Sequence, residues 1–518
     1  MCKAKVKFIF LAILFFGIFG WAESSLAANY YISNAPKGSH DCSSWVNACT
    51  PSDITYGGAH HNLFADGNNF YFDGGASGMT YASPYITNGT NGTDWTRGVT
   101  FATGAKSPSP SGHDGYVTFD GQGILETFLF FRNVSHVIID GEKNGAINWE
   151  LRNTKLDSGS PGRYIYAVIV EDSGSFGTKY STIRYIWVDK VSSGIKVLFN
   201  TNVDIGYNRI TNVYHETAID ARGFSDVALG TNKIHHNEIE NTYDPVAWSS
   251  VGRHGSCGNA TGYGPDGIQA SENVDIYNNT FTTRTGETWY CQHPDAIQAD
   301  WSKMRIYNNK FLGGPSLFQN SHERNSSSNV SDLWFYNNLM INYTNGMQSM
   351  LGGDGTTSRT RIYVFNNTFD GVKGGFAIPS SMHTLGDVQV RNNIFLDGWN
   401  VGWLPQSECG YITYSNNATG GRSMTCGAPP ADSYQINVTN TNGQMGTPTF
   451  VSRGSDYRLV ASDTVAKDHG YDLSAYFITD QDGTSRPQGV AWDIGAYEYV
   501  SGSGDTTPPL APTGLSVV

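Results

Sequence analysis

An apolar–Asn–apolar motif recurs along the chain between residues 204 and 419. The first seven copies place an apolar residue three positions before an Asn and another two positions after it, as in IGYNRI at 205–210. Successive copies lie 29, 42, 30, 29, 29, 26 and 24 residues apart. Including a weaker last copy, the motif aligns Asn208, Asn237, Asn279, Asn309, Asn338, Asn367, Asn393 and Asn417.

This period predicts an all-β chain folded as a right-handed parallel β-helix, with each motif at a corner between two short strands. Asn suits a corner because it tolerates the left-handed backbone conformation. Asparagines stacked coil on coil can also form a hydrogen-bonded ladder. Leucine-rich repeats would need Leu at fixed positions, and β-propeller blades would need about 40 residues. With less regular copies at 116–121, 136–141 and 182–189, we expect about ten or eleven coils.

The two ends of the chain differ from this solenoid, which we expect to span 29–500. Residues 1–28 carry three early lysines, an apolar run to Trp21 and then small residues, which is typical of a secretory signal. The apolar run is shorter than the roughly 20 residues of a membrane span. Residues 501–518 form a Gly/Ser/Pro linker and what resembles the first strand of a fibronectin type III domain. We therefore expect a secreted protein, extracellular, periplasmic or associated with the cell surface, without membrane insertion.

Composition limits the partners. The formal net charge is −13, and removing three Lys and Glu23 with the signal changes it to −15. An acidic surface argues against nucleic acid as a partner. An acidic polymer would need local cations or a bound metal. We expect a monomer with a polysaccharide as its substrate or ligand.

Six cysteines follow the signal, and their even number in an oxidising compartment predicts disulfides. Fifteen pairings are formally possible for six cysteines. Metal ligation is the alternative, but no C-x-x-C spacing supports it. Neighbours along the chain suggest the pairs Cys42 with Cys49, Cys257 with Cys291, and Cys409 with Cys426.

A second alignment runs through the strands TAIDARG at 217–223, DGIQASE at 266–272, DAIQADW at 295–301 and SLFQNSH at 316–322. Strand alternation predicts one outward column, and Asp266 and Asp295 should begin strands of adjacent coils, about 4.8 Å apart. Such a carboxylate pair suits a Ca²⁺ site, an acid/base pair for glycoside hydrolysis or metal-assisted β-elimination. Pro-Asp is also a turn signal, which is the structural alternative. The outward column contains Asp220, Gln269, Gln298 and Gln319.

Further polar residues lie near these strands in the sequence. His293 is the candidate for acid/base work because His titrates near neutral pH. Arg253 or Arg324 would neutralise a uronate carboxylate, and Asp300 would join the two aspartates around a metal. His322 and Trp301 are further candidates for contact with substrate. An insertion of about 13 residues before Asp266, carrying Cys257, is expected to form a wall of the groove.

The opening ANYYIS at 28–33 and the closing segments DYRL at 456–459 and RPQGVAWDIGAYEY at 486–499 resemble those of secreted bacterial β-helix proteins of the pectate-lyase-like superfamily. The resemblance implies an N-terminal capping strand. DGIQ and DAIQ also loosely resemble the Asp strands of polygalacturonase-type hydrolases. However, the G-H-G and R-I-K elements of those enzymes and the D-P-H of epimerases are absent, so no subfamily or catalytic residue transfers.

These observations favour an extracellular carbohydrate-active enzyme that resembles a polysaccharide lyase, acts on an acidic polysaccharide and uses Ca²⁺. A glycoside hydrolase on the same fold is the first alternative. A non-catalytic glycan-binding or adhesion protein is the second, and a purely structural solenoid is the third.

Overall fold

The computed structural model describes residues 27–501, apart from internal gaps. The predicted signal at 1–28 and the tail at 501–518 therefore lie almost wholly outside the described residues. Side chains of some strand residues that border the gaps, Gln319 and Cys426 among them, are not described either. The gaps are 66, 89–97, 135, 156–164, 172–179, 199–201, 215–216, 223–228, 242–265, 272, 284–294, 300–302, 321–331, 349–359, 378–384, 398, 404–411, 422–424, 427–435 and 438.

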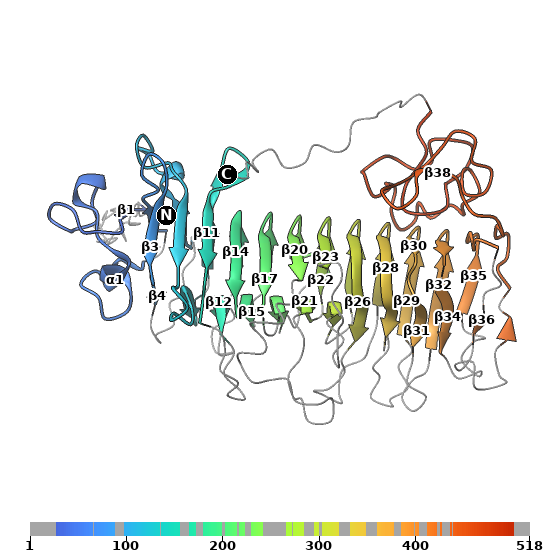
Figure 1. Ribbon diagram of the computed structural model, residues 1–518, viewed down its shortest axis with the longest axis horizontal. Helices are drawn as coiled ribbons and strands as arrows, with labels where there is room; N and C mark the ends of the chain where they lie inside the picture. Colours follow the sequence, from blue (N-terminus) through green and yellow to red (C-terminus); the bar gives the residue numbers. More distant parts are fainter. Residues whose placement is uncertain are drawn as a thin grey trace, which may run out of the picture.

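The chain forms the predicted right-handed parallel β-helix, with strands stacked along its long axis (Figure 1). Within the described ranges, a first series of thirteen strands makes one parallel sheet, and each strand from β16 on leads into an Asn corner. The series comprises β1 (Asn29–Ile32), β2 (Asn69–Phe72), β5 (Val99–Thr103), β8 (His136–Asp140), β13 (Tyr180–Arg184), β16 (Val203–Gly206), β19 (Asn232–His235), β22 (Val274–Tyr277), β25 (Met304–Tyr307), β27 (Asp332–Tyr336), β29 (Thr360–Phe365), β32 (Leu385–Arg391) and β35 (Ile412–Ser415).

A second and a third series complete each coil. The long strands β26 (Lys310–Asn320) and β28 (Leu339–Gln348) belong to both. The second series also has β3 (Met79–Ala82), β6 (Val117–Asp120), β11 (Trp149–Arg152), β14 (Ile186–Val191), β17 (Arg209–Val213), β20 (Glu238–Asn241), β23 (Thr280–Thr283), β30 (Thr368–Asp370) and β33 (Ile394–Leu396). The third has β4 (Ile86–Thr87), β7 (Leu129–Arg132), β12 (Tyr166–Glu171), β15 (Ser193–Leu198), β18 (Thr217–Arg222), β21 (Asp266–Ala270), β24 (Asp295–Ala299), β31 (Gly374–Ala377), β34 (Trp399–Trp403) and β36 (Thr425–Cys426).

Other elements are short. One helical turn, α1 (Pro51–Ile54), and 3₁₀ turns at Trp45–Asn47, His61–Leu63 and Gly104–Lys106 lie near the N-terminus. Among the described residues, no helix is long and apolar enough to cross a membrane. The predicted number of coils stays a prediction. The remaining strands are β9 (Glu142–Lys143), β10 (Ala146–Ile147), β37 (Ile436–Asn437), β38 (Phe450–Ser452) and β39 (Asp456–Leu459).

The inside of the solenoid is a continuous apolar core. Near the N-terminus it is aromatic, and the rings of Phe70 and Phe101 stack with centroids 5.3 Å apart. In the central coils it becomes aliphatic. There the residue three positions before the ladder Asn is an isoleucine that is fully buried. Ile205, Ile234 and Ile276 stand in register on successive strands of the first series. Each coil thus buries its apolar side chains against its two neighbours, as expected of a solenoid.

The aligned asparagines form the predicted ladder. Oδ1 of Asn309 accepts hydrogen bonds from the main-chain N and Nδ2 of Asn279, each at 3.0 Å. Its own Nδ2 donates to Oδ1 of Asn338 at 3.0 Å and to a main-chain carbonyl of the preceding coil at 2.9 Å. The same pattern continues to Asn417, whose Nδ2 donates to Oδ1 of Asn440 at 3.3 Å. The ladder therefore extends one coil beyond the sequence motif.

The prediction that the ladder asparagines take the left-handed conformation is wrong by one position. The positive φ belongs to the preceding residue, which is Tyr207 (φ 60°) before Asn208 and His236 (φ 53°) before Asn237. The turn is completed one residue early because each ladder Asn must direct its main-chain N–H and its side chain along the stack. In later corners the left-handed residue is itself Asn, with φ between 50° and 58°: Asn278, Asn308, Asn337, Asn366, Asn392 and Asn416.

The C-terminal residues 450–501 fold back along these corners, beside the later coils (Figure 1). Nδ2 of Asn366 donates to the carbonyls of Asp493 and Gly495, at 2.8 and 3.1 Å. Asn392 exchanges two hydrogen bonds with the main chain of Tyr471, at 2.8 and 2.7 Å. At these two corners the first Asn thus binds the C-terminal segment, while the second forms the ladder.

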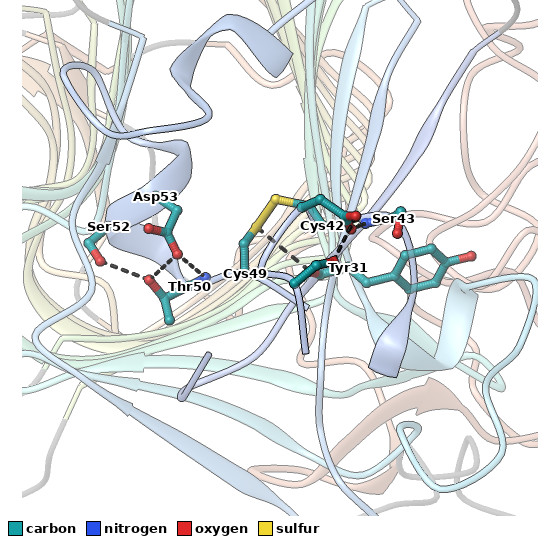
Figure 2. Close-up of a disulfide and its surroundings, with 9 residues drawn as sticks. Tyr31, Cys42, Ser43, Cys49, Thr50, Ser52 and Asp53 are labelled. Carbon is teal, nitrogen blue, oxygen red and sulfur yellow. Dashed lines mark hydrogen bonds between the residues drawn. A yellow bond between two sulfur atoms is a disulfide. The ribbon is translucent and has the colours of Figure 1, made fainter. Parts of the chain in front are cut away.

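A disulfide joins Cys42 to Cys49 near the N-terminal end, as predicted (Figure 2). The main chain of Tyr31 in β1 bonds to both cysteines, which ties the loop to the terminal strand of the first series. The carboxylate of Asp53 accepts hydrogen bonds from the main chain and hydroxyl of Thr50, both at 2.8 Å, and so caps α1. The other predicted pairs, Cys257 with Cys291 and Cys409 with Cys426, involve residues or side chains outside the description.

Candidate functional site

Asp266 and Asp295 occupy the same place in two neighbouring coils. They are the first residues of β21 and β24, and these strands pair in parallel through Ile268 and Ile297. Oδ1 of Asp266 accepts a hydrogen bond of 2.8 Å from the main-chain N of Asp295. The two residues are 3% and 1% exposed. As the alignment predicts, two acidic strand starts stack on one another.

Glycine at 267 allows this close stacking. A Cβ on Gly267 would lie 2.5 Å from the carbonyl oxygen of Ala296 and 3.0 Å from the ring of Phe281. The contact with the carbonyl oxygen is too short for a side chain and the contact with the ring is tight, so this position in β21 requires glycine. The Asp-Gly start of this strand therefore has a packing reason, and the Asp beside it is held against the next coil.

Gln269 connects the aspartates to a row of amides. Its Nε2 donates to Oδ2 of Asp266 and to Oε1 of Gln298, both at 2.8 Å. Gln269 is buried, whereas Gln298 is partly exposed. A carboxylate and two amides from adjacent coils therefore form one hydrogen-bonded strip on the third strand series, which we name the polar strip.

The predicted column is present as one register row along the third series. Asp220 pairs with Gln269, Gln269 with Gln298, and Gln298 with Gln319. The row extends further than predicted, to Lys196 in β15 at one end and Gln348 in β28 at the other. It runs along the solenoid axis with one polar residue per coil.

Asp220 is fully buried and tightly held. Nε and Nη2 of Arg222 donate to its two carboxylate oxygens at 2.5 and 2.7 Å, and the hydroxyl of Tyr166 donates to Oδ2 at 3.1 Å. The ammonium of Lys196 lies 5.2 Å from the centre of the Tyr166 ring. Sequence reasoning missed the contributions of Tyr166 and Lys196, because β12 and β15 precede the regular Asn motif. The spacing of their apolar residues is the one signal that could have aligned them.

Several candidate residues lie outside the described part of the chain. Their roles remain predictions, as does that of the insertion of about 13 residues before Asp266, because residues 242–265 are not described. Within the described part, no group of three or more His, Cys, Asp or Glu side chains is arranged to hold a metal ion. The third proposed ligand, Asp300, is one of the undescribed residues; the others are His293, Arg253, Arg324, His322 and Trp301.

The arrangement offers two buried carboxylates beside neutral amide donors and acceptors. Burial strengthens the interaction of a carboxylate with any cation or proton donor, because less water screens it. Carboxylate oxygens are also the ligands that Ca²⁺ prefers, so the donor chemistry of Asp266 and Asp295 fits that ion. The amides match hydroxyl groups, which both donate and accept hydrogen bonds.

Among solved structures, two matches share little sequence with this protein. Pectate lyase Pel9A is 14% identical, with a TM-score of 0.40 over 92% of this chain and 97% of that chain. The A-module of the Azotobacter vinelandii mannuronan C-5 epimerase AlgE6 is 14% identical, with a TM-score of 0.18 over 72% of this chain and 88% of that chain. No family model and no curated protein match the chain. The strand pairing itself establishes the β-helix, and no subfamily is assigned.

Proposed function

We propose that this protein is an extracellular enzyme that cleaves an acidic polysaccharide along the polar strip, by lyase-type β-elimination with Ca²⁺. The observation that carries the proposal is the stacked, buried pair Asp266 and Asp295, joined at 2.8 Å and continued by a row of amides. A fold gains nothing in core packing from two adjacent buried carboxylates, since burial of charge is costly. A shared task for the pair is the simplest reason to keep them.

Asp266 and Asp295, with Asp300, are the residues that would hold Ca²⁺. The ion would neutralise the uronate carboxylate and acidify the neighbouring C–H. His293 is the proposed group for proton transfer, and Arg253 or Arg324 would bind a uronate carboxylate. Lys196, Gln269 and Gln298 would position the chain along the axis. The proposal places cleavage at the aspartates and binding along the row.

Two alternatives share these residues. If the aspartates act directly as acid and base, the protein is a glycoside hydrolase. If they only support the strip, it is a glycan-binding protein without turnover. Asp220 shows such a supporting role, because its buried carboxylate is bound by Arg222 at both oxygens.

Incubation of the purified protein with acidic and neutral polysaccharides, with Ca²⁺ or with a chelator, separates the three. Absorbance of unsaturated uronate together with new reducing ends is the expected result, and it should disappear with the chelator. Reducing ends without that absorbance would make the protein a hydrolase. Binding without products would make it a lectin-like protein and would overturn the proposed enzyme activity.

A further inference from the structure

The orientation of the Gln269 amide is fixed by its neighbours. Its Nε2 lies 2.8 Å from Oδ2 of Asp266 and 2.8 Å from Oε1 of Gln298. Rotating the amide by half a turn would place its oxygen against both of these acceptors, which is unfavourable. Both hydrogen atoms of Nε2 are therefore used in hydrogen bonds within the protein, and Oε1 is the atom of this amide that can accept a further hydrogen bond.

That oxygen is buried and has no hydrogen-bond partner among the described residues. Gln269 as a whole is 6% exposed. The hydroxyl of Ser316, which pairs in register with Asp295, is likewise buried without a partner in the described part of the chain. Buried polar atoms without partners cost about 1–3 kcal/mol each, and such atoms are rare in native proteins. Two of them beside the aspartate pair indicate that something else supplies the missing partners.

The chemistry of the missing hydrogen-bond partner follows from the properties of Gln269 Oε1. An amide oxygen accepts hydrogen bonds and cannot donate them. A carboxylate would be repelled there, whereas a hydroxyl satisfies it and can donate from one group while accepting at another. Gln269 also belongs to the register row that contains Gln298. The two aspartates lie in a different register row, in which Asp266 pairs with Thr217 and Asp295 pairs with Ser316. A ligand spread along the amide row would meet it directly.

We infer that Gln269 determines specificity: its Oε1 accepts a hydrogen bond from a hydroxyl of the sugar bound next to the Asp266–Asp295 pair. This inference rests on the proposed function and adds a requirement to it. The sugar at this position must present an unmodified hydroxyl, so polymers substituted there by methyl or acyl groups are poor substrates.

The test compares wild type with Gln269→Leu and Gln269→Met, both of which lack the acceptor. Gln389→Leu is the matched control, because Nε2 of Gln389 also donates to a carboxylate, that of Asp387, on a different strand series. The substrates are oligosaccharides of the polymer that wild type cleaves, free or methylated at single hydroxyls. The readouts are kcat/KM, Ca²⁺ affinity by calorimetry and the thermal midpoint.

In wild type and the control, methylation of the contacted hydroxyl should lower kcat/KM about tenfold, equivalent to one lost hydrogen bond. In both Gln269 variants the ratio between free and methylated substrate should approach one, with Ca²⁺ affinity unchanged. An unchanged preference in both variants would overturn the inference while leaving the proposed function intact. A selective loss of Ca²⁺ affinity would also overturn it, by assigning Oε1 to the cation.

If wild type cleaves no glycan, the proposed function fails. The inference is then read from binding of the same oligosaccharides. Equal affinity of wild type for free and for every methylated form would overturn it. A preference for one free hydroxyl that both Gln269 variants lose would support it.

Discussion

The main-chain N–H of Asp295 donates to Oδ1 of Asp266 at 2.8 Å, across two coils of the solenoid. The bond fixes where the second strand starts relative to the first carboxylate. The other carboxylate oxygen of Asp266 accepts a hydrogen bond from Gln269. Asp266 therefore holds the polar strip together, in addition to being a candidate for the proposed reaction.

Replacing Asp266 with Ala should therefore destabilise the protein. The change leaves the buried N–H of Asp295 and Nε2 of Gln269 without this acceptor, at about 1–3 kcal/mol for each group. Denaturant unfolding measures the loss. Asp472→Ala, at an exposed position of the C-terminal segment, is the control and should change stability by less than about 0.5 kcal/mol. Equal stability of the two variants would show that the strip does not depend on Asp266.

The Asn ladder should be a larger contributor at each step. Asn309→Ala removes an acceptor of two hydrogen bonds and a donor in three more within a fully buried stack. We expect a loss of about 2–4 kcal/mol, because several buried groups lose partners at once. Asn34→Ala, at an exposed side chain that bonds to the carbonyl of Thr80, is the control and should be nearly neutral.

The corner Asn366 allows a test of the second role of the double-Asn motif. Asn366→Gly keeps the left-handed backbone (φ 50°) but removes the bonds to Asp493 and Gly495, whereas Asn366→Ala also strains the backbone. Limited proteolysis should release the C-terminal segment faster in both variants, and Ala should be the less stable of the two. Wild-type protection in Asn366→Gly would contradict the docking role.

The docked C-terminal segment should respond to pH through Asp493. Burial and, to a smaller extent, the nearby Glu498 together raise the pKa of this carboxyl from 3.8 to about 7. Burial likewise raises the pKa of Asp480 and of Glu498. A carboxyl whose pKa is higher in the folded state stabilises the fold when protonated. Its contribution is fully present below about pH 3.8 and is lost as the pH rises through about 7.

Calorimetry between pH 5 and pH 8.5 should therefore show the thermal midpoint falling as the pH rises. In Asp493→Asn, whose side chain cannot ionise, the thermal midpoint should fall less between these two pH values. This holds regardless of how the substitution changes the midpoint at a single pH. Asp472→Asn should keep the wild-type slope. The same slope in wild type and Asp493→Asn would contradict the assignment of the proton to this carboxyl.

The sequence was sufficient to predict the fold because one constraint repeats. Each coil must place an Asn on the ladder and an apolar residue on either side of it, so Asn309 and its equivalents mark every later coil. The same periodicity aligned Asp266 with Asp295 and Gln269 with Gln298. It did not locate the left-handed residue, because Asn is favoured both at that position and on the ladder.

Other features depend on contacts between distant segments and leave no local signal. The hydroxyl of Tyr166 reaches Asp220 across 54 residues, and Asn366 binds a carbonyl 127 residues later. The sequence also does not predict that Oε1 of Gln269 is without a partner among the described residues, because this depends on which neighbours accept hydrogen bonds from its Nε2. Residues in the connecting segments, such as His293, remain predictions from residue type alone.

The most direct test of the account is the activity of Asp266→Asn/Asp295→Asn on whichever acidic polysaccharide wild type cleaves. Circular dichroism and the thermal midpoint would first confirm that the double variant is folded. The account predicts that formation of unsaturated products falls at least about a hundredfold, with Asp472→Asn at the wild-type rate. Undiminished cleavage by the folded double variant would contradict the central claim that this carboxylate pair carries the reaction.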